Sequence, residues 1–488
     1  MQLRATAVTL FGVLASFGTA WLIESLAGLH TDVVVLAVVL SLTLSRRVGH
    51  GRAWYVSVPL LIVVAVAAGL VGTLMLEHVA LGDTLFTLAL AAGIWLRRFG
   101  PWGRRAGTLV ALPFIAILVT PAPPGISTEH SLWTAAFSAI ALGWVLISQY
   151  LGRRLGLLAP ETPAAVYEPP ARRSPTGRIA RIPASSKMAA QMGVGLGLAF
   201  LLGHQVFPQH WPWVVLTAYI VASGNRGRGD VVYKSGLRLV GAAVGTVLAT
   251  LLANSFTPGN RWAIVALFVV VGIAAWLRTW SYAFWAAGVT SALALLYGYS
   301  GQTGTSLLGT RLEAIGCGAA LAIAAAWFVL PIKTSQVLRR RVADALAVFS
   351  DLLTAIRRRD TPAIDDQQQR LDAALIQAEQ LRPALHAHRL ATQPFRAAAH
   401  QVDAITGLRT LGRSSRAITT RITERPELTA APGMAGELAA LHAALTATRR
   451  RLGHAEVDEP SPPPLAAADL PEAAELHAAL RSIAAAFN

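Results

Sequence analysis

The side chains best suited to chemistry in this sequence are charged residues within long apolar runs. Arg311 and Glu313 both lie near the start of the run Leu307–Leu330. A guanidinium in an apolar setting can hold a carboxylate, and a carboxylic acid can take up or release a proton. In a simpler interpretation, Arg311 extends to the polar edge of the run and Glu313 faces water. The two residues therefore suggest a site for anion binding and proton transfer, with an interfacial position as the alternative.

Three further charged residues lie near the ends of apolar runs. Arg238 follows Lys234 by about one helical turn. It predicts a cationic entry for anions, and a charge that only orients the chain in a membrane is the alternative. Glu24 and Asp32 lie on either side of one short joint. Both are candidate proton-transfer groups, with an ordinary interfacial position as the alternative.

Aromatic side chains form two groups in the second half of the chain. Trp211, Trp213 and Tyr219 make the first group, on which planar molecules could stack. The second group consists of Trp276, Trp280, Tyr282 and Trp285. Because Trp and Tyr also collect at membrane–water interfaces, an interfacial belt is the alternative for both groups.

Sequence motifs for metal, nucleotide or hydrolytic chemistry are missing. The only cysteine is Cys317, within an apolar run, where a buried and inert side chain is expected. The lysines are Lys187, Lys234 and Lys333, and none belongs to a Walker A sequence. No zinc-protease motif, nucleophile elbow or cysteine–histidine metal spacing occurs. We therefore expect no enzyme activity, no metal and no cofactor.

Composition predicts a membrane protein. Of 488 residues, 54% are hydrophobic and 14% are charged, and the mean hydropathy is +0.50, whereas soluble domains carry roughly 25% charged residues. A run of about 20 apolar residues crosses a bilayer core as a helix. We expect twelve spans, at about Ala5–Ala27, Val33–Ser45, Tyr55–Leu76, Thr84–Leu96, Ala106–Thr120, Leu132–Tyr150, Met188–Val206, Trp211–Ser223, Gly236–Ala253, Trp262–Leu277, Ser281–Tyr299 and Leu307–Leu330.

The net charge of +16 is distributed unevenly among the joints between these runs. Joints after the odd-numbered runs contain Arg261 as their only basic residue, whereas joints after the even-numbered runs are rich in arginine. The positive-inside rule then places both termini in the cytoplasm, at an inner or plasma membrane. Topology explains the basic charge, so nucleic acid is not an expected partner.

The predicted spans fall into two sets of six, in residues 1–150 and 188–332. A cytoplasmic linker rich in Pro and Arg, residues 151–187, separates them. Ile94-Trp-Leu-Arg97 ends the fourth run, and Ala275-Trp-Leu-Arg278 ends the tenth. We therefore interpret the halves as a parallel duplication, which in transporters places the route between the halves near mid-membrane.

Residues 333–488 are rich in Ala, Leu, Arg, Gln and Glu and predict a cytoplasmic helical domain. Pro-containing breaks separate amphipathic stretches at about Gln336–Arg359, Ile364–Leu390, Phe395–Ile422, Gly436–Leu452 and Glu472–Ala486. The predicted fold class is therefore all-α: a polytopic membrane protein with about twelve transmembrane helices in two six-helix repeats, followed by a C-terminal cytoplasmic helical domain.

Four segments of the second half form a pattern: His210-Trp-Pro-Trp-Val-Val-Leu-Thr217, Arg238-Leu-Val-Gly-Ala-Ala-Val-Gly-Thr246, Thr310-Arg-Leu-Glu-Ala-Ile-Gly316 and Leu330-Pro331. This pattern resembles the fusaric acid resistance protein family, also called the aromatic acid exporter family. The resemblance covers about residues 190–335 well and the first half more loosely. It implies an inner-membrane exporter of small aromatic or otherwise amphipathic organic acids, and Arg311 matches the family pattern.

Two classes of function remain open. The first is a secondary exporter of organic acids driven by the proton gradient, which would confer resistance to such acids or to antibiotics. The second is a passive anion channel, as in the distantly similar plant aluminium-activated malate channels, or a membrane scaffold whose tail recruits a partner. The expected partners are a small organic acid and the lipid bilayer. A homo-oligomer such as a dimer is compatible with this organisation, as is a periplasmic adaptor in a bacterium with an outer membrane.

Overall fold

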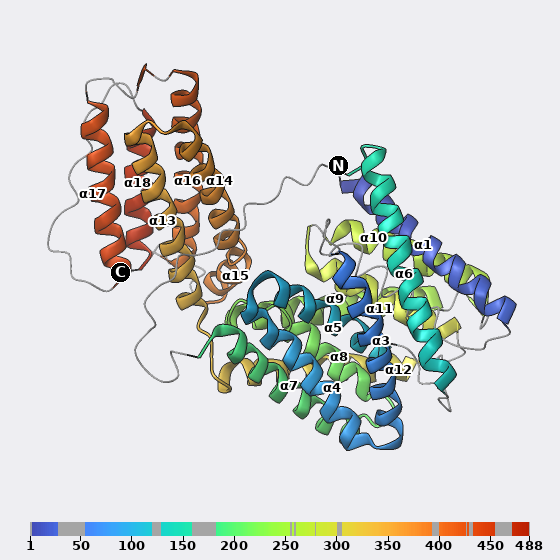
Figure 1. Cartoon of the computed structure of the whole chain (residues 1–488). Helices are drawn as coiled ribbons and strands as arrows, with labels where there is room; N and C mark the ends of the chain where they lie inside the picture. Colours follow the sequence, from blue (N-terminus) through green and yellow to red (C-terminus); the bar gives the residue numbers. More distant parts are fainter. Residues whose placement is uncertain are drawn as a thin grey trace. The chain divides into compact units, whose positions relative to one another are not determined.

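The computed structural model shows a helical protein (Figure 1). The structure describes residues 2–27, 54–119, 128–158, 182–253, 256–257, 260–278, 280–299, 305–392, 400–425, 427–428, 433–453 and 471–487. Within these ranges every regular element is a helix and no strand occurs. The predicted all-α class is therefore confirmed.

Every predicted span that lies in the described residues coincides with a helix, although the ends differ by several residues. The predicted span Val33–Ser45 lies outside the described residues, so the total of twelve stays a prediction. The helices that correspond to predicted spans are α1 (Gln2–Ala27), α3 (Trp54–Glu77), α4 (Val79–Trp95), α5 (Gly100–Val119), α6 (Thr128–Arg154), α7 (Ala184–Val206), α8 (Trp211–Ala222), α9 (Arg228–Ala253), α10 (Arg261–Leu277), α11 (Tyr282–Tyr299) and α12 (Thr305–Phe328).

The lengths and surfaces of several of these helices suit a lipid bilayer. Five segments among the described residues are long and apolar enough to cross a membrane, namely Thr6–Leu26, Val79–Phe99, Ala184–Val206, Arg228–Leu251 and Gly309–Phe328. Large apolar side chains also face outward: on α9, Val240, Val247 and Leu251 are 58%, 60% and 66% exposed. Soluble monomers rarely expose large contiguous apolar patches. The protein is therefore a membrane protein.

Helices α9 and α11 approach closely because two glycines face α11. A Cβ atom on Gly241 would overlap the carbonyl oxygen of Ala283, and a Cβ atom on Gly245 would overlap that of Ala287. The hydroxyl of Ser291 donates a hydrogen bond to the Gly245 carbonyl at 3.0 Å. Small residues spaced by four allow this contact between helix backbones, and such packing is a main source of helix association in lipid.

The α9–α11 contact generates a prediction. We expect Gly245→Ala to lower the free energy of unfolding by about 1–3 kcal/mol, because the added methyl group has no space. The matched control is Gly236→Ala on the same helix, where nothing lies within 4 Å of the added Cβ. That variant should be neutral or slightly stabilising, since alanine favours helix. Thermal unfolding in detergent measures both. Equal stability of the two variants would contradict the packing.

An aromatic cluster joins α4 and α5 to α7. The Phe86 side chain on α4 is fully buried. Its ring makes edge-on contacts with Phe114 on α5 and Phe200 on α7, each with centroids 5.5 Å apart. Edge-to-face contacts of this kind contribute about 0.5–1.5 kcal/mol beyond the burial of area. The cluster holds a helix from the predicted first half against one from the second.

Two contacts hold α12 to α7 and α8. The buried Gln191 side chain near the start of α7 donates to the carbonyls of Val329 and Leu330, at 3.0 and 3.2 Å, just after α12 ends. These carbonyls follow a helix end, where backbone groups lack intrahelical partners. Along α12, a Cβ atom on Gly318 would overlap the carbonyl oxygen of Val214 on α8. Helices α7, α8 and α12 are therefore packed side by side.

The contacts divide the chain into two units. One contains α1 to α12 except for the first residues of α9, which belong with the C-terminal residues in the second unit. The second unit is a helical bundle with its own apolar core, which includes Leu338, Leu346, Leu411 and Leu476. Its helices are α13 (Thr334–Arg358), α14 (Thr361–Glu379), α15 (Arg382–Thr392), α16 (Gln401–Glu424), α17 (Met434–Leu452) and α18 (Pro471–Ala485).

The predicted helix Ile364–Leu390 is interrupted in the structure. Helix α14 ends at Glu379, and α15 begins at Arg382. Pro383 explains the break, because proline has no N–H group and its ring clashes with the carbonyl four residues earlier. Proline is tolerated in the first turn of a new helix, which is where α15 places it.

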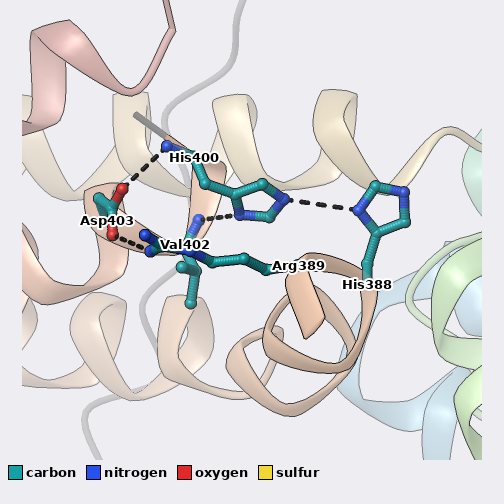
Figure 2. A network of polar contacts seen from close by, with 5 residues as sticks. All are labelled: His388, Arg389, His400, Val402 and Asp403. Atoms are coloured by element: carbon teal, nitrogen blue, oxygen red, sulfur yellow. Dashed lines mark hydrogen bonds and ion pairs between the residues drawn. The ribbon is translucent and has the colours of Figure 1, made fainter. Parts of the chain in front are cut away.

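A polar network caps the start of α16 (Figure 2). The Nδ1 atom of His400 accepts a hydrogen bond from the Val402 N–H at 3.1 Å, and Asp403 accepts one from the His400 N–H at 2.8 Å. Asp403 also accepts from Arg389 at 2.7 Å. The Nε2 atom of His400 lies 3.4 Å from Nδ1 of His388. Because Nδ1 of His400 is an acceptor, the cap requires a neutral imidazole.

This cap predicts a pH-sensitive helix end. Burial, followed by the charges of His388 and Arg389, lowers the pKa of His400 below 6.5, although Asp403 acts in the opposite direction. The unfolded state then binds more protons near this pKa, so stability is present above pH 6.5 and is lost as the pH falls through the lower folded-state pKa.

We expect the first amides of α16 to lose protection against hydrogen exchange between pH 7.5 and 5.5, after correction for intrinsic rates. In His400→Asn the loss should be absent, because asparagine caps helices without titrating. Hydrogen-exchange mass spectrometry of the whole chain checks this. The same pH dependence in the variant would show that His400 is not the titrating cap.

Candidate functional site

The joint between α7 and α8 brings several polar and aromatic side chains together. Helix α7 ends at Val206 and α8 starts at Trp211, with Pro212 in its first turn. Pro208 cannot continue α7, whereas Pro212 has the backbone angle that a first helical turn requires. Gly203 allows the turn, because its Cβ position lies only 3.0 Å from the Cβ atom of Trp211.

Arg311 on α12 faces this joint. Its guanidinium carbon lies 5.3 Å from the ring centroid of Trp213. Both side chains are buried, with 3% and 8% of their surface exposed. A cation over an indole ring is worth about 2 kcal/mol when desolvated. The structure therefore brings together two of the predicted site residues, and the Arg311 side chain is covered by protein and does not extend into water.

Glu313 does not accompany Arg311 into this site. It is exposed, whereas Arg311 is buried. Residues two apart on a helix do not face each other, so one side of α12 holds Arg311 while another carries Glu313. The two side chains therefore lie on different sides of α12, and the predicted roles in anion holding and proton transfer stay predictions.

The first residue of α8 contacts a histidine that the sequence did not single out. The ring of Trp211 lies 4.9 Å from that of His204 and 5.5 Å from that of Phe200, both on α7. His204 in turn lies 2.8 Å from the carboxylate of Asp83 on α4. The two residues of this pair are far apart in sequence, so no spacing rule could have identified it.

His210 lies between α7 and α8 and contacts Trp213. The two ring centroids are 4.3 Å apart, with an interplanar angle of 35°. Burial lowers the pKa of His210, so its imidazole is neutral at physiological pH. The cation that lies against the ring of Trp213 is therefore the guanidinium of Arg311.

The other predicted site residues lie elsewhere. Tyr219 is buried on α8, two turns beyond Trp211. Arg238 is 3% exposed on α9, where it contacts the phenol of Tyr282, and its Nε atom is buried without a hydrogen bond. Glu24 is half-buried on α1. Asp32 lies outside the described residues. Arg238 therefore marks a second cationic position, distinct from the one at the α7–α8 joint.

No group of three or more potential metal ligands occurs among the described residues. The arrangement at the α7–α8 joint instead combines a buried cation with aromatic faces. A guanidinium binds carboxylates through two parallel hydrogen bonds, and aromatic rings cover planar apolar groups. These side chains suit a small organic anion with a flat apolar part.

Comparison with known proteins identifies the region that contains this joint. Residues 194–325 match a family described as fusaric acid resistance protein-like. Over these residues the chain is similar to the fusaric acid resistance protein-like family. The matched region contains Trp211, Trp213 and Arg311 but not Asp83. The family points to a membrane transport or efflux role rather than to an enzyme. Neither a curated protein nor a solved structure matches the chain.

The Arg311–Trp213 contact predicts an energetic coupling between the two residues. A double-mutant cycle with Arg311→Met and Trp213→Leu should give a coupling energy of about 1–2 kcal/mol in thermal unfolding, because either variant removes the cation–ring interaction. A second cycle, with Trp211→Phe in place of Trp213→Leu, is the matched control. Trp211 contacts His204, so its coupling to Arg311 should be smaller. Equal couplings would contradict a specific cation–ring interaction.

Proposed function

We propose that this protein is a secondary transporter that exports small aromatic or otherwise amphipathic organic acids across the inner or plasma membrane, driven by the proton gradient. The observation that carries the proposal is the buried Arg311 over Trp213, inside the region that matches the fusaric acid resistance protein-like family. A charged side chain buried in a membrane protein is costly and commonly marks a functional site. Such a site, in a transport family, favours an anionic substrate.

The chemistry of the joint favours aromatic acids among organic anions. In a site of low dielectric constant, a guanidinium attracts a carboxylate far more strongly than it does in water. Trp211 and Trp213 would provide flat apolar surface for the body of the molecule. Tyr219, deeper along α8, would extend this lining. Acids without an apolar part would gain only the charge interaction and would bind less tightly.

Arg238 would serve at the opposite side of the membrane. In the proposed topology, with both termini and the linker 151–187 in the cytoplasm, Arg238 lies near the cytoplasmic end of α9. Its buried Nε atom makes no hydrogen bond, which suits a group that awaits an anion. Arg238 would attract substrate from the cytoplasm, and Arg311 would hold it near the outer face.

We also propose that residues 1–150 and 188–332 are repeats of six spans, with residues 333–488 as a cytoplasmic helical domain. A local likeness supports the duplication. Trp95 contacts Phe99 with ring centroids 5.2 Å apart, and Trp276 contacts Trp280 at 5.6 Å. The two contacts occupy corresponding positions of the matching sequences Ile94-Trp-Leu-Arg97 and Ala275-Trp-Leu-Arg278.

Transport by purified protein in proteoliposomes tests the proposal, with fusaric acid as the probe. We expect wild-type protein to accumulate the acid against its gradient when a proton gradient is imposed. Arg311→Ala should abolish transport without reducing membrane insertion. The matched control is Arg104→Ala, which removes an exposed arginine on α5 and should leave transport intact.

The other outcomes are equally informative. Normal transport by Arg311→Ala would remove this residue from the site. Transport that persists unchanged after the proton gradient is collapsed would contradict proton coupling. Large voltage-driven anion currents in a planar bilayer would instead favour a channel. If the protein produced neither flux nor current, that result would favour a membrane scaffold.

A further inference from the structure

A histidine and an aspartate join α4 to α7 within the membrane unit. His204 Nε2 lies 2.8 Å from Asp83 Oδ2, and the side chains are 30% and 13% exposed. The second oxygen of Asp83, Oδ1, is buried and makes no hydrogen bond. A buried polar atom without a hydrogen-bond partner lowers the stability of the folded protein. Such an atom on a titratable group is therefore a candidate for a functional role.

Opposing effects act on the charge of this pair. His204 lies in the last turn of α7, where the helix dipole favours a positive charge, and Asp83 lies just beyond the first turn of α4. Burial disfavours both charges. The ring of Phe200 is nearly parallel to that of His204, with centroids 6.2 Å apart, and Trp211 covers it from 4.9 Å.

The pair is linked to the candidate anion site through the first turn of α8. Trp211 contacts His204, and Trp213 lies under Arg311. Both tryptophans belong to the same helical turn. A displacement of this turn relative to α7 would alter the contact of Trp211 with His204, and a displacement relative to α12 would alter the contact of Trp213 with Arg311. Among the described residues, this turn connects a titratable pair to a buried cation.

Other charged or titratable groups lie at the same end of the helices packed around the pair. They are Glu77 at the end of α3, His78 before α4, His210 before α8, and Arg311 and Glu313 on α12. Glu77, His78 and Glu313 are exposed. The described residues of α5 near this end carry no charge. His204 is the titratable group that contacts the carboxylate of Asp83.

We propose that Asp83 and His204 form the proton-binding site that couples the proton gradient to transport; this inference rests on the proposed export function. With a neutral imidazole, the pair carries one negative charge. Uptake of one proton by His204 gives an imidazolium–carboxylate pair with no net charge and a stronger bond between α4 and α7. Release of the proton restores the negative charge. Because α4 and α7 come from different predicted halves, proton binding acts across the interface where such transporters move.

The first test measures proton binding without any substrate. A protonated imidazole quenches the fluorescence of a neighbouring indole, so protonation of His204 should quench Trp211. In nanodiscs, wild-type protein should show a pH-dependent emission component that is missing in both His204→Gln and Trp211→Phe. A component that is unchanged in His204→Gln would overturn the inference, whether or not the protein transports fusaric acid.

The second test separates coupling from transport. In proteoliposomes, Asp83→Asn and His204→Gln should lose proton-driven accumulation of fusaric acid but retain exchange of labelled for unlabelled acid, which needs no net proton movement. Glu77→Gln, at an exposed carboxylate on the same end of α3, should retain both activities. Variants of the pair that keep driven accumulation, or that lose exchange as well, would overturn the coupling role. Wild-type protein with neither activity would contradict the export function instead.

Discussion

A bilayer core contains no water that could hydrogen-bond to the chain, and this constraint shapes the membrane unit. Its described segments are helices, which satisfy peptide groups internally. Where a helix ends, side chains supply the missing partners, as Gln191 does for the carbonyls of Val329 and Leu330. The same constraint acts on charge: Arg311 is covered by the ring of Trp213, and Asp83 is bound to His204.

Close helix contacts then determine which of these groups meet. The glycine at position 318 lets α12 lie against α8, which places Arg311 beside Trp213. The cluster around Phe86 holds α4 against α7 and so places Asp83 within reach of His204. The polar site is thus a consequence of apolar packing. In lipid, where apolar burial does not drive helices together, this packing depends on shape.

The sequence predicts most of the helices and part of the site. Apolar runs locate helices because their length matches a bilayer, and Arg311 and Trp213 could each be chosen by residue type. Their contact could not be predicted, since it depends on how α8 packs on α12. Glu313 is exposed while Arg311 is buried on the same helix, and their joint role in anion binding and proton transfer stays a prediction. The sequence places Asp83 in a joint between two predicted spans. Its contact with His204 depends on the packing of α4 against α7.

The start of α9 is hydrogen-bonded to the segment that leads into the C-terminal helices. The N–H of Arg228 donates to the carbonyl of Ile332 at 3.0 Å, and that of Gly229 to the hydroxyl of Thr334 at 3.0 Å. These acceptors come from the segment that leads into α13, and they satisfy amides at a helix start that no intrahelical carbonyl can reach. A chain truncated before Ile332 would expose those amides and fray a helix that continues into the membrane. Loss of activity after such a truncation would therefore not prove a regulatory role for the tail.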